Sequence, residues 1–359
     1  MSDSLAFEVR RDDLRKTRFL ELAAPEPAAG EALLRVDHFA LTANNVTYAV
    51  AGDSMSYWGF FPAESGWGRV PVWGFADVAR STLAELPQGE RLYGYFPMAT
   101  HLVVRPAQIS SGGFVDAAPH RAALPPVYNQ YRRVLADPGY SAESEDRQAL
   151  LQPLFMTGWL LADFLADSSF FGARRVLLGS ASSKTAISLA FVLARQGEYE
   201  VIGLTSRRNA RFVEKLGCYD RVVPYEEIAS IEASAPIAFV DMANDGPVTN
   251  AVHHHFRDAL VHASLVGITH WESAPRAADL PGAKPAFFFA PSQIEKRTRE
   301  WGGRVLQERI GEAFRDFALE SQAWLETKHE RGRAAVERAY RDTLEGRARP
   351  DQGLMLSLA

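Results

Sequence analysis

Cysteine is almost absent from this sequence, which contains Cys218 alone among 359 residues. One thiol cannot form an internal disulfide, and it cannot provide the set of thiolates that binds a structural zinc ion. The sequence also lacks an apolar run long enough to cross a bilayer, and residues 1–18 are charged where a signal peptide would be apolar. We therefore expect a cytoplasmic protein with no membrane partner and no structural zinc.

An excess of positive charge is missing as well. The formal net charge is −5, which argues against a nucleic-acid partner and against a polybasic membrane anchor. The hydrophobic share of 47% and the charged share of 23% are those of ordinary globular proteins. A chain of this length suits two domains better than one.

The first third of the chain is rich in short strand patterns. In residues 31–41, apolar and polar side chains alternate before a short apolar run, as expected of a strand that enters a core. Residues 101–105 are predicted to form a second, apolar strand. Glycine and proline turns separate such segments, which predicts a small barrel or sandwich. Residues 111–147 contain several prolines and little periodicity, and we expect them to form a long loop or lid.

The middle third alternates between strand and helix patterns. After an apolar helix at 150–167, helices are expected at 184–195 and 209–216. Short, almost wholly apolar strands are expected at 175–179, 199–205, 221–224, 237–241 and 259–267. This rhythm predicts an α/β fold with a doubly wound parallel sheet. The charged segments 294–301, 305–326 and 332–345 are expected to be helical.

The turn after the first of these strands is serine-rich. A dinucleotide-binding turn normally reads Gly-x-Gly-x-x-Gly and holds phosphate at the start of the next helix. Here only Gly179 is present, and the candidate phosphate ligands are hydroxyl and ammonium groups: Ser180, Ser182, Ser183, Lys184 and Thr185. These side chains can bind a pyrophosphate, or the hydroxyls can simply cap the helix.

The second strand ends without a carboxylate. A carboxylate there accepts the ribose hydroxyl of NAD, whereas arginine suits the extra phosphate of NADP. Ser206, Arg207 and Arg208 follow this strand and favour NADP, the alternative being a solvated pair of cations. Asp241, at the end of the fourth strand, is a candidate ribose ligand or the cap of a turn.

The order of these segments resembles that of the medium-chain dehydrogenase/reductase superfamily. Residues 36–48, 89–94 and 212–220 resemble three motifs of its zinc-independent quinone oxidoreductase and enoyl reductase branch. The resemblance implies a GroES-like domain from 1–148 and 292–359, and a Rossmann-like nucleotide domain over 149–291. It also implies a possible homodimer through residues 259–268.

The sequence also departs from the family pattern, and these departures concern the zinc site and the phosphate loop. Gly74-Phe75-Ala76 stands where zinc-dependent members have Gly-His-Glu, so no zinc is expected. The serine-rich turn, together with residues 269–272 and 287–293, resembles a separate subfamily of the superfamily.

The resemblance also implies catalytic residues. Tyr48 is the positional candidate for a proton donor, with Asn44 and Asn45 as polar orienting groups. The alternative is that Tyr48 is a packed aromatic residue. The expected substrate cleft is lined by Tyr57, Tyr128, Tyr131, His270 and Trp271.

The implied activity is NADP-dependent hydride transfer to a small apolar conjugated carbonyl: an enone, a quinone or an enoyl thioester. Two alternatives remain open at this point. One is a redox-inactive relative that serves as a binding or accessory protein. The other is a protein that binds a different phosphorylated ligand, such as a coenzyme A ester.

Overall fold

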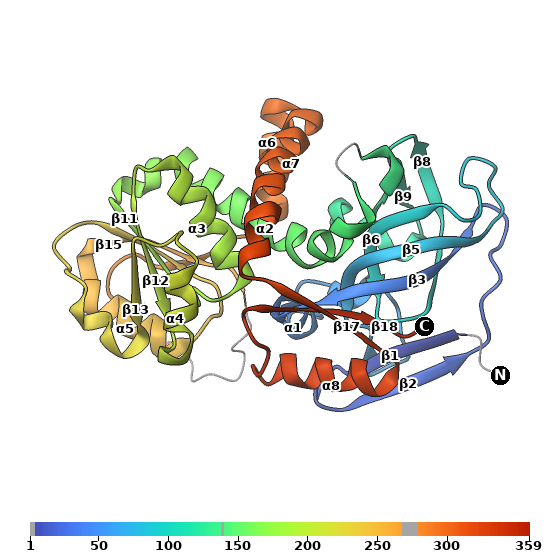
Figure 1. Cartoon of the computed structure of the whole chain (residues 1–359), viewed down its shortest axis with the longest axis horizontal. Coiled ribbons are helices and arrows are strands. Elements are labelled where there is room, and N and C mark those ends of the chain that lie inside the picture. The colour runs from blue at the N-terminus through green and yellow to red at the C-terminus, as the bar shows by residue number, and fades with distance from the viewer. Residues whose placement is uncertain (1–3, 138–139, 268–278) are drawn as a thin grey trace. The chain divides into compact units, whose positions relative to one another are not determined.

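The computed structural model describes residues 4–137, 140–267 and 279–359. The chain divides into two compact units (Figure 1). The first comprises Met1–Leu150 and Glu326–Ala359, and the second comprises Leu151–Leu325. His270 and Trp271, two of the predicted cleft residues, lie outside the described residues.

The first unit is built from two sheets. The small sheet has the order β2-β1-β4, with bounds Thr17–Leu22, Ser4–Arg10 and Trp67–Gly68. The large sheet has the order β17-β18-β3-β5-β6-β10-β9-β8, and β7 (His101–Val104) also pairs with β3. Its central strands are β3 (Ala32–Leu41), β5 (Pro71–Ser81) and β6 (Arg91–Pro97), and they are antiparallel to one another. The predicted β-rich domain is confirmed.

The expected loop over residues 111–147 is in part a sheet. β8 (Pro106–Ser110), β9 (Gly113–Asp116) and β10 (Gln130–Arg133) extend the large sheet outward from β6. Gly113 makes the close pairing possible, because a Cβ there would lie 2.1 Å from the Tyr131 carbonyl oxygen. The prediction of a loop or lid was therefore wrong for β9 and β10, whose few apolar residues gave no period, whereas β8 precedes the predicted segment.

The C-terminal segment returns to the first unit mainly as strands. β17 (Glu326–Arg331) and β18 (Gln352–Ser357) flank helix α8 (Arg333–Leu344), and β18 pairs with β3. The predicted domain boundary at residue 292 lies too early in the chain. Helices α6 (Ala290–Trp301) and α7 (Gly303–Glu320) belong to the second unit, which ends at Leu325. Stacking of Phe317 on Phe155, with ring centroids 5.0 Å apart, explains this assignment.

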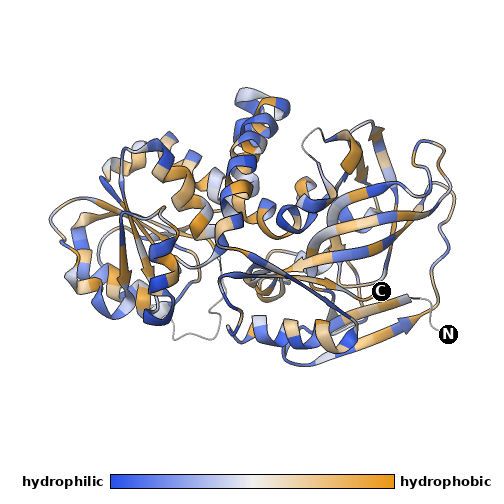
Figure 2. Ribbon diagram, in the orientation of Figure 1, coloured by the Kyte–Doolittle hydropathy of each residue, from blue (hydrophilic) through white to orange (hydrophobic). Residues whose placement is uncertain are grey.

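The second unit contains one parallel sheet of six strands in the order β13-β12-β11-β14-β15-β16. Their bounds are β11 Arg175–Leu178, β12 Glu200–Thr205, β13 Arg221–Pro224, β14 Ile237–Asp241, β15 Leu260–Leu265 and β16 Pro285–Phe287. In chain order this is third, second, first, fourth, fifth, sixth, the order of dinucleotide-binding folds. The strands are largely hydrophobic (Figure 2), as expected for a sheet covered on both faces. The predicted doubly wound sheet is confirmed.

Helices also precede and separate these strands, and α6 and α7 follow them. Those before and between the strands are α2 (Glu145–Asp167), α3 (Lys184–Gln196), α4 (Arg207–Lys215) and α5 (Gly246–Phe256). The helical segment that includes α2 is long and apolar enough to cross a membrane by composition, but 56% of its apolar window is buried inside the protein. It is therefore weak evidence for a span and has the burial of a core helix.

The predicted dimer edge at residues 259–268 needs correction. β15 lies between β14 and β16, so its backbone is paired on both sides. β16 is the terminal strand instead, and Phe287 on it is half exposed. The sequence did not reveal β16, because a strand of three residues is too short to show a period.

Candidate functional site

The turn between β11 and α3, where the sequence predicts phosphate binding, is tightly folded. Ser180 adopts φ 51°, a left-handed conformation that a non-glycine residue rarely takes. Ala181 is fully buried, and its amide donates to the Leu204 carbonyl at 2.8 Å. The turn is therefore held tightly against β12, although a serine stands where glycine would be unstrained.

The serine hydroxyls of this turn have internal partners. Ser183 is the N-cap of α3, and its Oγ accepts from the Ala186 amide at 3.2 Å. Ser182 Oγ accepts from Asn209 Nδ2 at 3.0 Å, which ties the turn to α4. Because both hydroxyls act as acceptors in these bonds, each retains its own proton for a ligand. Capping and phosphate binding are thus compatible.

Cations stand at the start of both neighbouring helices. Lys184 is the first residue of α3, Arg207 and Arg208 open α4, and neither helix has an acidic residue in its first turn. A cation at this end faces the positive end of the helix dipole, which is unfavourable unless an anion lies nearby. Glu227 forms an exposed ion pair with Arg207 at 2.8 Å. Ser206, the N-cap of α4, makes no side-chain capping bond.

Asp241 has a different environment from the one a ribose ligand needs. Its side chain is buried, and its Oδ1 accepts from the amides of Ala243 and Asn244 at 3.0 and 2.8 Å. Its Oδ2 accepts from Thr249 Oγ1 at 2.7 Å. Burial raises the pKa of this carboxyl, and the three donors partly oppose the rise. These contacts favour the turn-capping alternative.

Three of the predicted residues in the first unit come together. Tyr48 lies on α1 (Ala43–Val50), Tyr57 opens η1 (Tyr57–Gly59), and Tyr128 lies on η3 (Pro126–Asn129). The Tyr57 and Tyr128 hydroxyl oxygens are 3.3 Å apart, and the Tyr48 and Tyr57 ring centroids are 4.7 Å apart. We call the set that they form with three further rings the aromatic cluster: Tyr48, Tyr57, Phe60, Trp73, Tyr95 and Tyr128.

The Tyr48 hydroxyl, the predicted proton donor, is buried among other side chains. Burial raises its pKa, and the nearby Tyr57 adds to the rise. The side chains of Trp73, Asn44 and Tyr128 lie close enough to oppose this shift in part. Tyr48 therefore stays protonated at neutral pH, as a donor requires.

Two other predicted residues have structural contacts. Asn45 accepts from the Thr42 amide at 2.7 Å and donates to the Pro71 carbonyl at 2.7 Å, so it caps α1 and ties it to β5. Tyr131 is buried, and its hydroxyl donates to the Tyr95 carbonyl at 2.7 Å.

Sequence reasoning missed Trp73 and Tyr95, which face each other across β5 and β6. A repeated aromatic-glycine-aromatic pattern, at 73–75 and 93–95, is the signal that would have found them.

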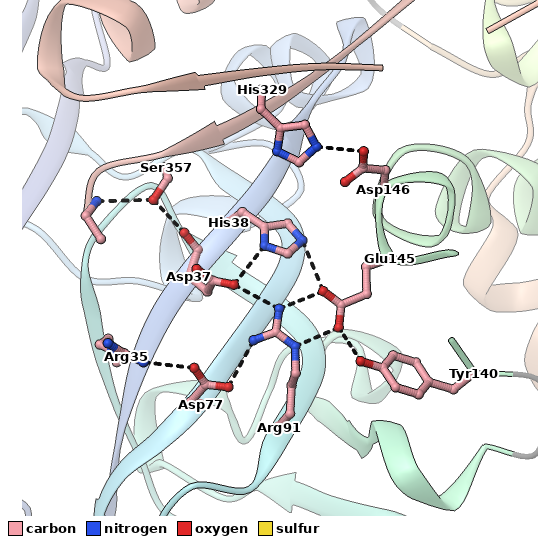
Figure 3. Close-up of polar contacts among 11 residues, drawn as sticks. Arg35, Asp37, His38, Asp77, Arg91, Tyr140, Glu145, Asp146, His329 and Ser357 are labelled. Carbon is pink, nitrogen blue, oxygen red and sulfur yellow. Dashed lines mark hydrogen bonds and ion pairs between the residues drawn. The ribbon is translucent and has the colours of Figure 1, made fainter. Parts of the chain in front are cut away.

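A charged network lies elsewhere in the first unit (Figure 3). Arg91 on β6 contacts three carboxylates, those of Asp37, Asp77 and Glu145. These contacts, above all that with Glu145, raise the pKa of Arg91. The pKa of Asp37 is lowered first by its hydrogen bond with His38 and then by Arg91. The network fastens the start of α2 to the large sheet and has no free cation to bind an anion. Within residues 4–137, 140–267 and 279–359, no group of three or more His, Cys, Asp or Glu side chains has the geometry to hold a metal.

Sequence comparison assigns the chain to a family. The family model described as "Protein of unknown function (DUF2855)" matches residues 39–349. The chain belongs to this family. No curated protein matches the sequence.

Solved structures resemble the chain in fold over almost its whole length. CurA from Vibrio vulnificus in complex with NADPH is 13% identical, with a TM-score of 0.64 and coverage of 98% of each chain. The mycobacterial protein Rv1454c complexed with NADPH is 16% identical, with a TM-score of 0.59 and coverage of 99% of each chain. A mutant form of enoyl thioester reductase from Candida tropicalis is 9% identical, with a TM-score of 0.59, 98% of this chain and 99% of that one being covered. The DUF2855 chain thus has the same two-domain fold as these proteins.

Proposed function

We propose that the protein is a zinc-independent, NADP-dependent oxidoreductase that acts on an apolar conjugated carbonyl compound. The observation that carries the proposal is the pairing of a dinucleotide-type sheet order with three cations at the starts of α3 and α4. The solved structures of similar fold that contain NADPH support it.

The residues proposed to hold the cofactor follow from the second unit. The α3 amides and the protons of Ser182 and Ser183 would bind the pyrophosphate, together with Ser180, Lys184 and Thr185. Ser206, Arg207 and Arg208 bind the phosphate on the adenosine ribose. Asp241 is left out of this set because its oxygens already have three donors. When bound, the nicotinamide supplies a hydride.

The aromatic cluster is proposed to receive the substrate. Its flat apolar rings suit a planar conjugated molecule, and the Tyr48 hydroxyl supplies a proton to the reduced substrate. Asn44, beside that hydroxyl, orients it.

Titration of the purified protein with NADPH and with NADH tests the proposal. We expect saturable binding of NADPH, tighter than that of NADH, and consumption of NADPH when a conjugated enone is added. Binding without turnover on any enone or quinone would support the redox-inactive alternative. Absence of NADPH binding at millimolar concentration would refute the proposal, and a copurified coenzyme A ester seen by native mass spectrometry would replace it.

A further inference from the structure

Two buried polar atoms in the aromatic cluster lack hydrogen-bond partners among the residues that the structure describes. They are the Tyr95 hydroxyl and the Trp73 indole nitrogen, Nε1. Tyr95 is fully buried, and Trp73 is 9% exposed. Buried tyrosine and tryptophan side chains normally direct these groups to an acceptor, because an unmet buried group is costly.

The pairing of β5 with β6 makes the two side chains neighbours. Trp73 on β5 is the register partner of Tyr95 on β6, and their ring centroids are 5.0 Å apart. Side chains paired in this way point to the same face. An indole N–H can only donate, and a tyrosine hydroxyl can donate as well. The Tyr48 hydroxyl lies close enough to the Trp73 side chain for Trp73 to lower the pKa of Tyr48, but no hydrogen bond of normal geometry joins the two. The pair therefore presents two adjacent donors whose hydrogen-bonding capacity is unmet.

The surroundings limit which acceptor fits these donors. Tyr48 and Tyr128 stand over Tyr95 with ring centroids 5.6 and 4.8 Å away, so the donors lie within an apolar, aromatic setting. Arg121 is the charged group that acts on the Tyr95 hydroxyl, and it is ion-paired with Asp116 at 3.1 Å. An uncharged oxygen suits such a setting better than a carboxylate, which would need an unpaired cation.

We propose that Tyr95 and Trp73 are specificity residues that hydrogen-bond an uncharged carbonyl oxygen of the ligand. This inference rests on the proposed function, since it concerns the same aromatic cluster. It adds that the cluster distinguishes a carbonyl compound from a hydrocarbon of the same shape before any reduction occurs. A site with buried donors rejects an analogue that lacks the matching acceptor.

The test measures binding without cofactor, so it is independent of whether NADPH binds. The probes are 4-(4-fluorophenyl)but-3-en-2-one and 1-fluoro-4-(3-methylbuta-1,3-dienyl)benzene, in which a CH2 group replaces the carbonyl oxygen, and both are followed by fluorine NMR. The wild-type protein should prefer the ketone, and Tyr95→Phe should reduce that preference at least fivefold. The same variant should melt at a higher temperature, because it loses a buried hydroxyl without a partner.

Tyr340→Phe is the matched control. Tyr340 is equally buried, but its hydroxyl donates to the Leu14 carbonyl at 3.1 Å. This variant should melt at a lower temperature and keep the full preference for the ketone. Trp73→Phe should reduce the preference as Tyr95→Phe does, and it serves as the test if Tyr95→Phe does not fold. An unchanged preference in both cluster variants, or no preference in the wild type, would overturn the inference. Failure of NADPH binding with an intact ketone preference would overturn the proposed function alone.

Discussion

Arg91 and Glu145 are joined by two parallel contacts, from Nε to Oε1 and from Nη2 to Oε2, each 2.6 Å long. Glu145 is almost fully buried and also accepts from the Tyr140 hydroxyl at 2.6 Å. A bidentate pair of this kind fixes orientation as well as distance. It fixes the first turn of α2 on strand β6.

We predict that Glu145→Gln lowers the free energy of unfolding by about 2 kcal/mol, because Arg91 then has two carboxylates in place of three and one donor without a charged partner. Urea unfolding followed by circular dichroism measures this. Glu143→Gln, at an exposed position on the preceding turn, is the control and should change stability by less than about 0.5 kcal/mol. Equal effects of the two substitutions would contradict the assignment.

Ser180→Gly should stabilise the protein. Ser180 holds φ 51°, which costs a residue with a Cβ atom about 1 kcal/mol more than glycine. We expect the free energy of unfolding to rise by roughly 0.5–1 kcal/mol, measured by denaturant titration. Ser182→Gly is the comparison, since Ser182 is outside the left-handed region and bonds to Asn209, and it should lower stability. A loss of stability in Ser180→Gly would show that its hydroxyl contributes more than the backbone strain costs.

The double substitution Arg207→Ala with Arg208→Ala should weaken NADPH binding on the order of tenfold to a hundredfold, because the phosphate on the ribose loses charge-assisted bonds. NADH, which lacks that phosphate, should bind as before. Isothermal titration with both nucleotides checks the difference. Arg211→Ala, an exposed residue on the same helix, is the control. Equal weakening of NADPH and NADH would argue against a role for the pair in choosing the cofactor.

Tyr48→Phe should reduce turnover of a conjugated enone about a hundredfold while the far-ultraviolet circular dichroism stays unchanged. The substitution removes the hydroxyl and keeps the ring that packs on Tyr57. Steady-state oxidation of NADPH measures the effect. Unchanged turnover would favour the alternative that Tyr48 only fills space.

Stability should fall below pH 6.5 partly because of His262. Burial lowers the pKa of this histidine to about 4, and its ring stacks on Phe171 with centroids 3.8 Å apart. The unfolded chain, with an ordinary pKa near 6.5, takes up the proton first as the pH falls. The contribution is therefore complete above about pH 6.5 and is lost progressively toward pH 4.

The melting temperature as a function of pH tests this prediction. His262→Gln should flatten the decrease between pH 6.5 and 4 relative to the wild type. His254→Gln, at an exposed position on α5, should leave the decrease unchanged. A wild-type slope in the His262 variant would show that other groups cause the loss.

The parallel sheet could be predicted from the sequence because its strands are buried on both faces and read as short apolar runs. β17 could not, since it is an exposed strand at the edge of its sheet, with the polar sequence Glu-Thr-Lys-His-Glu-Arg. Only its pairing with β18 makes it a strand.

The candidate site shows the same contrast. Tyr48, Tyr57 and Tyr128 were expected in the site, and the structure brings them together; whether they bind a substrate remains a prediction. Trp73 and Tyr95 were missed because no local motif joins residues on two strands. Their proximity depends on the register of β5 and β6, in which Gly74 pairs with Gly94. In the sequence, the only sign of this register is that aromatic residues flank both glycines.

The pairing of β18 with β3 has a consequence for synthesis on the ribosome. Strand β3, at Ala32–Leu41, obtains this partner only after Gln352–Ser357 has been translated. The residues of the second unit, by contrast, are contiguous and are complete once Leu325 has emerged. Since domains generally fold as units during translation, the second unit is expected to fold before the first is complete. Until Gln352–Ser357 has been synthesised, the backbone groups of β3 that pair with β18 remain unpaired.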